Sequence, residues 1–171
     1  MWNGPFSGLM CKVVEALVKI DQLLDDERYQ SAIQRADNFY KKVSPITYTH
    51  PLGYWLEGLL SCGEDELVRN TIKARILDRI ESNGFISYSG AESYAYVSGV
   101  IQIGIVLFKM GYTDEAKKIR GYGRMVQKKS DTGGLFQYAD RNGDLNRDIH
   151  SEINSWGTKY FCELERMIES V

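Results

Sequence analysis

Apolar residues recur every three or four positions along most of the chain, which is the spacing of one face of an α-helix. This periodicity predicts seven helices. The first two are expected over 8–24 and 27–43, with Asp25 and Asp26 between them. The other five are expected at 51–62, 65–82, 92–110, 113–129 and 152–168. The stretch 92–110 is apolar nearly all round, so we expect it to be a buried central helix.

Proline and glycine mark several of the helix ends. Ser44 precedes Pro45 and should end the second helix, because a residue before proline disfavours the helical conformation. Pro51 suits the first position of the third helix, with Thr49 or His50 as its cap. Gly63 and Gly111 are expected to end the third and fifth helices, and Thr113 to cap the sixth.

The segment 131–161 organises the rest of the chain, because it holds the densest group of polar, acidic and aromatic side chains. Gly133 and Gly134 should turn the chain after the sixth helix, and 135–138 should be extended. Asn142 and Gly143 predict a tight turn in which both residues have a positive φ. Ser151 or Asp148 is expected to cap the last helix.

The connections alternate between short ones and long ones that carry glycine and aromatic residues. The short ones are 25–26, 61–64 and 111–112, and the long ones are 44–49, 83–92 and 130–151. This alternation predicts stacked helical hairpins whose long loops share one end. An internal repeat supports it, since 79–86 and 127–136 both run from a polar helix end through glycine to Phe85 or Phe136.

The glycine–aromatic turns and the hairpin alternation resemble the α/α-toroid superfamily, which includes terpenoid cyclases, prenyltransferases and many glycan-active enzymes. The segment HPLGYWLEGLL at 50–60 is similar to a motif of uncharacterised toroid proteins encoded near polysaccharide genes. The resemblance implies one all-α domain over 1–171, arranged as a partial toroid, with its site at the loop-bearing end. It also implies that the remainder of a longer chain, or a second copy, completes the ring.

Composition limits the other classes of function. A net charge of −2 gives no broad electrostatic attraction to nucleic acid. No apolar run is long enough to span a bilayer, and the N-terminus lacks the pattern of a signal peptide. Cys11, Cys62 and Cys162 are odd in number and lack zinc-ligand spacing, which favours a cytoplasmic protein without metal or other cofactor. No GxSxG, HExxH or DDxxD motif occurs.

His50, Tyr54 and Glu57 are spaced to share one face of the third helix. A histidine and a glutamate placed this way can do acid–base chemistry on a sugar. The alternative is structural: His50 caps the helix and Glu57 is a salt-bridge partner. Glu92 and Glu152 are expected to open the fifth and seventh helices, where a glutamate can be catalytic or simply complement the helix dipole.

Aromatic residues lie close to these carboxylates, and aromatic rings next to carboxylates suit sugar binding. The candidate catalytic residues are therefore His50, Glu57, Glu92 and Glu152. The candidate substrate-binding residues are Tyr54, Tyr94, Tyr96, Tyr138, His150 and Trp156.

The acidic loop at 140–152 alternates Asp and Asn as the beginning of a calcium loop does. Its glycine stands at the fourth position of the loop, where the calcium motif has it at the sixth, and its twelfth residue is Ser151. A solvated β-turn therefore fits better than a calcium site.

Two functional hypotheses follow. The first is a toroid domain that binds or processes a glycan at its loop-bearing end. The second is a non-catalytic helical scaffold or oligomerisation module, because the open ends of an arc of helices expose apolar faces. Convergence of the candidate residues on one cavity would favour the first.

Overall fold

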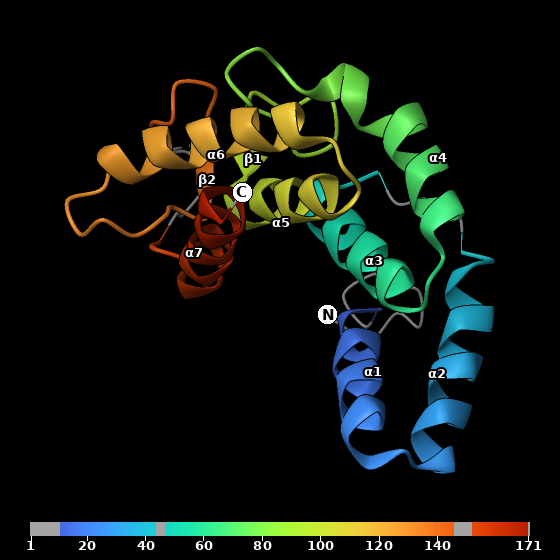
Figure 1. Cartoon of the computed structure of the whole chain (residues 1–171). Helices are drawn as coiled ribbons and strands as arrows, with labels where there is room; N and C mark the ends of the chain where they lie inside the picture. Colours follow the sequence, from blue (N-terminus) through green and yellow to red (C-terminus); the bar gives the residue numbers. More distant parts are fainter. Residues whose placement is uncertain (1–10, 44–46, 146–151, 171) are drawn as a thin grey trace.

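The computed structural model describes residues 11–43, 47–145 and 152–170. Within those ranges the protein consists of seven α-helices, a short 3-10 helix and a two-stranded antiparallel sheet (Figure 1), which confirms the predicted all-α class with short extended segments. In chain order the elements are α1 (Lys12–Leu24), α2 (Glu27–Tyr40), α3 (Thr49–Ser61), α4 (Asp65–Arg75), η2 (Leu77–Arg79), β1 (Tyr94–Tyr96), α5 (Val97–Lys109), α6 (Thr113–Lys128), β2 (Tyr138–Asp140) and α7 (Ser155–Glu169).

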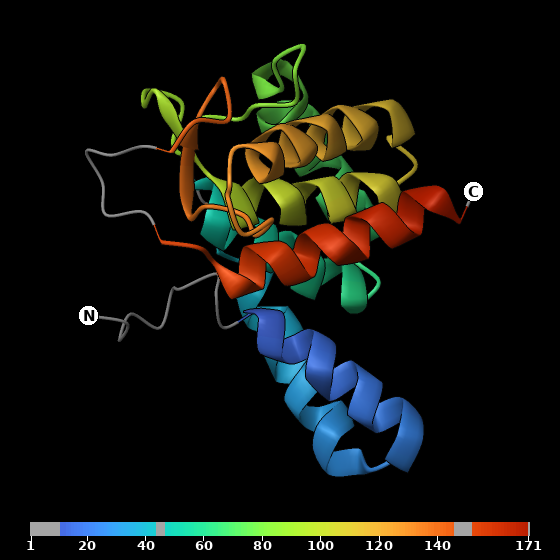
Figure 2. The ribbon, with the colours of Figure 1, turned by 90° about the vertical axis from the view of Figure 1, so that its left-hand side faces the viewer.

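The odd-numbered helices pack side by side in one row. α3 lies between α1 and α5, and α5 continues the row to α7. Each even-numbered helix packs against the odd-numbered helix before it, so that α2 lies on α1, α4 on α3 and α6 on α5. The α1–α2 hairpin projects away from the other helices, as both ribbon views show (Figures 1 and 2).

Helix α5 is the centre of the core. Every residue from 97 to 107 is buried, because α3, α6 and α7 all pack on this helix. The prediction of a buried central helix is therefore confirmed, and the cause is its near-continuous apolar surface. In the part of the chain that the structure describes, every helix is too short or too polar to cross a membrane.

Glycines let α3 and α5 approach each other closely. A Cβ atom on Gly99 would lie 2.6 Å from the Cα of His50 and 2.7 Å from its backbone nitrogen. A Cβ on Gly53 would lie 3.1 Å from that of Gln102. Gly99 thus allows the first turn of α3 to rest directly on α5, and this contact fixes the position of His50.

The predicted helix at 92–110 begins later than expected, because 94–96 is a strand. Tyr94, Ala95 and Tyr96 alternate in the period-2 pattern of a strand, and they pair antiparallel with β2. Ala95 and Ala139 face the core and are fully buried. The helix itself starts at Val97, whose N–H donates to the carbonyl of Gln137.

The prediction that Glu92 and Glu152 open helices is wrong. Glu92 lies in the loop before β1. Glu152 precedes a short extended stretch that is held by an isolated bridge between Phe136 and Ile153. Helix α7 begins only at Ser155, after Asn154. Both proposed caps of this helix, Asp148 and Ser151, lie outside the described residues.

Several other boundaries differ from the predictions. Helix α4 ends at Arg75 and gives way to η2, and α2 ends at Tyr40. The N-caps of α3 and α6 are Tyr48 and Tyr112, so Thr49 and Thr113 are the first residues inside their helices.

The predicted glycine turns are present. Gly84 and Gly133 have φ values of 88° and 72°, in the left-handed region that glycine reaches most readily. Gly143 also has a positive φ of 78°, but Asn142 does not. The turn is instead held by Asp140, whose Oδ1 accepts the N–H groups of Asn142 and Asp144. This use of the Asp140 carboxylate agrees with a β-turn, and residues 146–151 of the acidic loop lie outside the described part.

Candidate functional site

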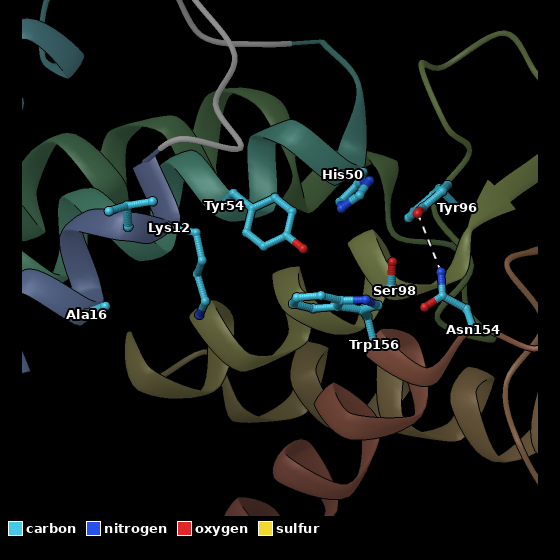
Figure 3. Close-up of a pocket in the computed structure, with 9 residues that line it drawn as sticks. Lys12, Ala16, His50, Tyr54, Tyr96, Ser98, Asn154 and Trp156 are labelled. Atoms are coloured by element: carbon cyan, nitrogen blue, oxygen red, sulfur yellow. Dashed lines mark hydrogen bonds between the residues drawn. The ribbon is translucent and has the colours of Figure 1, made fainter. Parts of the chain in front are cut away.

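A cavity of about 550 Å³ lies at the N-terminal ends of the odd-numbered helices (Figure 3). Helices α3, α5 and α7 each follow one of the long connections, and their first turns meet here. The described residues that line the cavity are Lys12, Val13 and Ala16 from α1, His50 and Tyr54 from α3, Tyr96 and Ser98 from β1 and the start of α5, and Asn154 and Trp156 at the start of α7.

His50 forms part of the cavity wall. Its imidazole stacks on the ring of Tyr96, with ring centroids 4.1 Å apart, and its centroid lies 4.8 Å from that of Tyr54. Its Nε2 atom is buried and makes no hydrogen bond within the described residues. Burial lowers the pKa of His50 to about 4, so the ring is neutral near pH 7. A neutral imidazole can accept or donate one hydrogen bond at this nitrogen.

Tyr54 from α3 and Trp156 from α7 supply rings to the cavity, with α5 between their two helices. Figure 3 shows the Tyr54 hydroxyl and the Ser98 hydroxyl directed toward the space above the Trp156 indole. The side chain of Trp156 is 63% exposed, which is unusual for so large an apolar group. Its exposure leaves a ring surface available to a ligand at the mouth of the cavity.

Asn154 has two roles at the start of α7. Its Oδ1 accepts the N–H of Gly157 at 3.1 Å and so caps the helix. Its amide nitrogen points to the Tyr96 hydroxyl, 3.5 Å away. The same side chain therefore sets where α7 begins and contacts the aromatic wall of the cavity.

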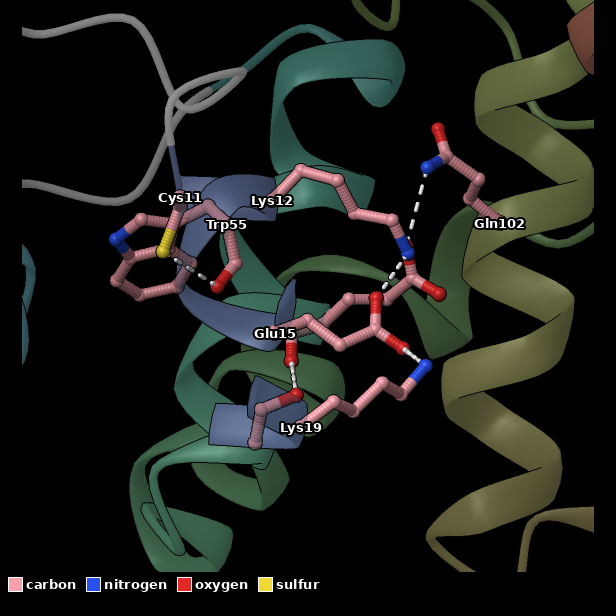
Figure 4. A network of polar contacts seen from close by, with 8 residues as sticks. Cys11, Lys12, Glu15, Lys19, Trp55 and Gln102 are labelled. Carbon is pink, nitrogen blue, oxygen red and sulfur yellow. Dashed lines mark hydrogen bonds and ion pairs between the residues drawn. The ribbon is translucent and has the colours of Figure 1, made fainter. Parts of the chain in front are cut away.

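Lys12 is the only charged side chain among the described residues that line the cavity, and its charge is compensated (Figure 4). Its Nζ lies 2.9 Å from Glu57 Oε2 and also pairs with Glu15, which in turn pairs with Lys19 at 2.8 Å. Burial alone would lower the pKa of Lys12, but the attraction of Glu57 and Glu15 outweighs it and raises the pKa. The cavity thus presents little free charge.

Glu57 does not line the cavity. Its side chain lies beneath Lys12, only 2% of the residue is exposed, and it accepts a hydrogen bond from Gln102 at 3.1 Å. Burial raises the pKa of the Glu57 carboxyl, and Lys12 opposes that rise. Of the two interpretations given for Glu57 in the sequence analysis, the structure therefore fits the salt-bridge partner and not the acid–base group.

The other two candidate carboxylates also lie away from the cavity wall. Glu92 accepts hydrogen bonds from the N–H and hydroxyl of Ser89, and these bonds lower its pKa. Glu152 is exposed, and its carbonyl accepts the N–H of Gln137. No carboxylate lines the cavity within the described residues, so the pair that glycoside cleavage needs is not assembled there.

Of the ten candidate residues, the structure brings four to the cavity: His50, Tyr54, Tyr96 and Trp156. Tyr94 and Tyr138 lie next to it through ring contacts, with Tyr138 in contact with both Tyr94 and Tyr96. His150 lies outside the described residues.

The sequence analysis missed the polar contributors Lys12, Ser98 and Asn154. Two of them carried a signal. Ser98 interrupts the apolar stretch of α5, and Asn154 is a residue type that favours an N-cap. Lys12 gave none, because its place at the cavity depends on how α1 packs.

No family model matches the chain, and neither a curated protein nor a solved structure does. The chemistry of the site follows from the residues that line the cavity. They offer ring faces, hydroxyls, an amide and a neutral imidazole, which together suit recognition of an uncharged polyhydroxylated molecule.

Proposed function

We propose that this protein is a glycan-binding domain built as an arc of an α/α toroid, with its ligand held in the cavity between α1, α3, α5 and α7. One observation carries the proposal: ring faces and polar side chains from α3, β1, α5 and α7 converge on a single cavity. Sugars bind through both kinds of contact, since their C–H faces stack on rings and their hydroxyls form hydrogen bonds.

The unpaired Nε2 of His50 supports a hydroxyl-bearing ligand. A buried polar atom without a partner costs free energy, and a ligand that reaches it by a small shift of the surrounding side chains and supplies the partner recovers that cost. A sugar hydroxyl both donates and accepts, so it can satisfy this nitrogen in either tautomer of the neutral ring.

The proposal favours binding over glycan cleavage, because the candidate carboxylates Glu57, Glu92 and Glu152 do not line the cavity. We further propose that the protein acts in the cytoplasm, in polysaccharide metabolism. The three cysteines, which are all unpaired, support a reducing compartment.

A binding experiment tests the proposal. Oligosaccharides of several compositions are titrated into the protein by calorimetry, with Trp156→Ala as the test variant and Leu23→Ala as the control. Leu23 is 83% exposed on α1 and does not line the cavity. We expect the wild type and the control to bind at least one saccharide and Trp156→Ala to lose about tenfold or more in affinity. Absence of saccharide binding to the wild type would overturn the proposal.

The alternative function is a scaffold or oligomerisation module, and exposed apolar residues on the projecting α1–α2 hairpin favour it. These residues are Val13, Ile20, Leu23, Leu24 and Phe39. Their exposure is typical of a surface that contacts another chain, either a second copy or the remainder of a longer toroid. Light scattering across a concentration series tests it: self-association that Leu23→Lys abolishes supports this function, and a monomer at all concentrations counts against a homo-oligomer.

A further inference from the structure

Tyrosine rings continue from the cavity in an unbroken series of contacts, which we call the tyrosine row. It comprises Tyr96, Tyr138, Tyr94, Tyr88 and Tyr48. Successive ring centroids are 5.1 Å, 5.6 Å, 6.0 Å and 4.9 Å apart in that order. Tyr88 also lies 6.2 Å from Tyr96, so four of the rings form one group at the cavity and Tyr48 extends it outward. All four distances lie within the range of direct aromatic packing.

The two-stranded sheet explains why these rings face outward. Successive side chains of a strand point to opposite faces, and the alanines of β1 and β2 occupy the buried face. Tyr94, Tyr96 and Tyr138 therefore share the other face, and none of the three is buried. At the far end of the row, Tyr48 is 48% exposed. The row is thus a surface feature.

Tyr96 belongs to both the cavity and the row. Its ring stacks on His50 inside the cavity and contacts Tyr88 and Tyr138 outside it. A ligand that fills the cavity and extends beyond it therefore contacts the tyrosine row directly outside the cavity.

The charges around the cavity favour an uncharged ligand. Glu57 and Glu15 neutralise Lys12, so an acidic sugar would have to compete with two carboxylates already in place. A proline-rich peptide also docks on aromatic surfaces, but prolyl residues lack the N–H donor. A sugar offers both donors and acceptors to the hydroxyls of Tyr54 and Ser98, and is favoured for that reason.

We propose, on the basis of the glycan-binding function proposed above, that the ligand is an uncharged oligosaccharide. One end of it occupies the cavity, and the rest lies along the tyrosine row. Stacking on successive rings then makes affinity increase with the length of the chain.

The test measures affinity by calorimetry for neutral glucan, mannan and galactan oligosaccharides, from disaccharide to hexasaccharide, and for uronate oligosaccharides of equal length. The variants are Tyr88→Leu and Tyr48→Leu, which keep an apolar side chain but remove the ring. Tyr29→Leu, on α2, is the matched control. Tyr48 is the more exposed of the two test positions, so its variant remains informative if Tyr88→Leu fails to fold, as judged by circular dichroism.

We expect the affinity of the wild type for neutral chains to rise with chain length. Tyr88→Leu and Tyr48→Leu should weaken binding of the hexasaccharide by about threefold to tenfold. Tyr48→Leu, which alters the ring at the far end of the row, should leave disaccharide binding unchanged. Tyr29→Leu should behave as the wild type does.

Other results have distinct meanings. Affinity that is independent of chain length, or unchanged in both row variants, overturns the row as a binding surface and leaves the cavity proposal standing. Preference for uronates overturns the uncharged ligand. Binding of a proline-rich peptide that Tyr88→Leu abolishes, without saccharide binding to the wild type, overturns both proposals.

Discussion

The imidazole of His50 stacks on the phenol ring of Tyr96, with their planes only 10° from parallel. His50 lies in the first turn of α3, and Tyr96 ends β1, so the contact joins two segments that are far apart in the chain. It holds the imidazole against the cavity wall, with Nε2 buried. Both the stability of the fold and the chemistry of the cavity depend on this arrangement.

Substitution of Gly99 should weaken the fold by separating α3 from α5. In Gly99→Ala the new Cβ would overlap the backbone of His50, and we expect a loss of about 1–3 kcal/mol in the free energy of unfolding. The control is Gly121→Ala in α6, where a Cβ meets no atom within 4 Å and the helix gains about 0.5–1 kcal/mol. Urea unfolding measures both, and equal stabilities of the two variants would contradict the close contact.

His50 should make stability depend on pH in the mildly acidic range. Its pKa falls from 6.5 to about 4 on folding because burial disfavours the charged ring. Between these values the unfolded chain binds more protons than the folded one, so stability is lost as pH falls from about 6.5 toward 4. We expect this loss to be about 1–3 kcal/mol in the wild type.

The variant His50→Gln isolates that contribution. Unfolding free energies of wild type and variant are measured at pH 7 and at pH 4.5, and the difference between them cancels the titration of groups that both share. The wild type should lose more stability than His50→Gln over this interval. Parallel losses would show that His50 titrates normally in the folded protein.

Lys12 should contribute strongly to stability through Glu57. In Lys12→Met, Glu57 stays buried without its main cationic partner, and we expect a loss of about 3 kcal/mol at pH 7. The loss should shrink in acid, because protonation removes the uncompensated charge. Lys19→Met removes a lysine that is 68% exposed and should cost no more than about 1 kcal/mol. Equal costs at the two positions would refute the buried pair.

Two substitutions of Asn154 should separate its role as the cap of α7 from its role in ligand binding. Asn154→Ala removes the cap of α7 and should lower the unfolding free energy by about 1 kcal/mol. Asn154→Asp keeps an acceptor for the Gly157 N–H and should retain most of that stability, but it loses the amide donor near Tyr96. Thermal melts and saccharide titrations check the two effects, and equal destabilisation by both variants would speak against the cap.

Local periodicity was enough to predict the helices, since each one carries its own apolar face. The strand at 94–96 was missed because its partner, 138–140, lies far along the chain, and an apolar run read alone favours a helix. The same holds for Glu57. Whether it is a catalytic group or a salt-bridge partner depends on Lys12, forty-five positions earlier in the sequence.

Four of the nine described residues that line the cavity were predicted, for a related reason. His50 and Tyr54 share a helix face, and that spacing is visible in the sequence. Val13 and Ala16 look like ordinary core positions of α1, and only the packing of the row turns them toward the cavity. The contact of Gly99 with His50 was equally hidden, because a glycine inside an apolar helix does not reveal what approaches it.

The projecting α1–α2 hairpin has a consequence for ligand binding. The hairpin packs on the other helices mainly through α3, yet α1 forms one wall of the cavity and α7 the opposite wall. A molecule that contacts both Val13 and Trp156 therefore links α1 to α7. Because such a ligand binds only the state in which the hairpin is docked on the other helices, it stabilises that state. Occupancy of the site should therefore protect α1 and α2 from proteolysis.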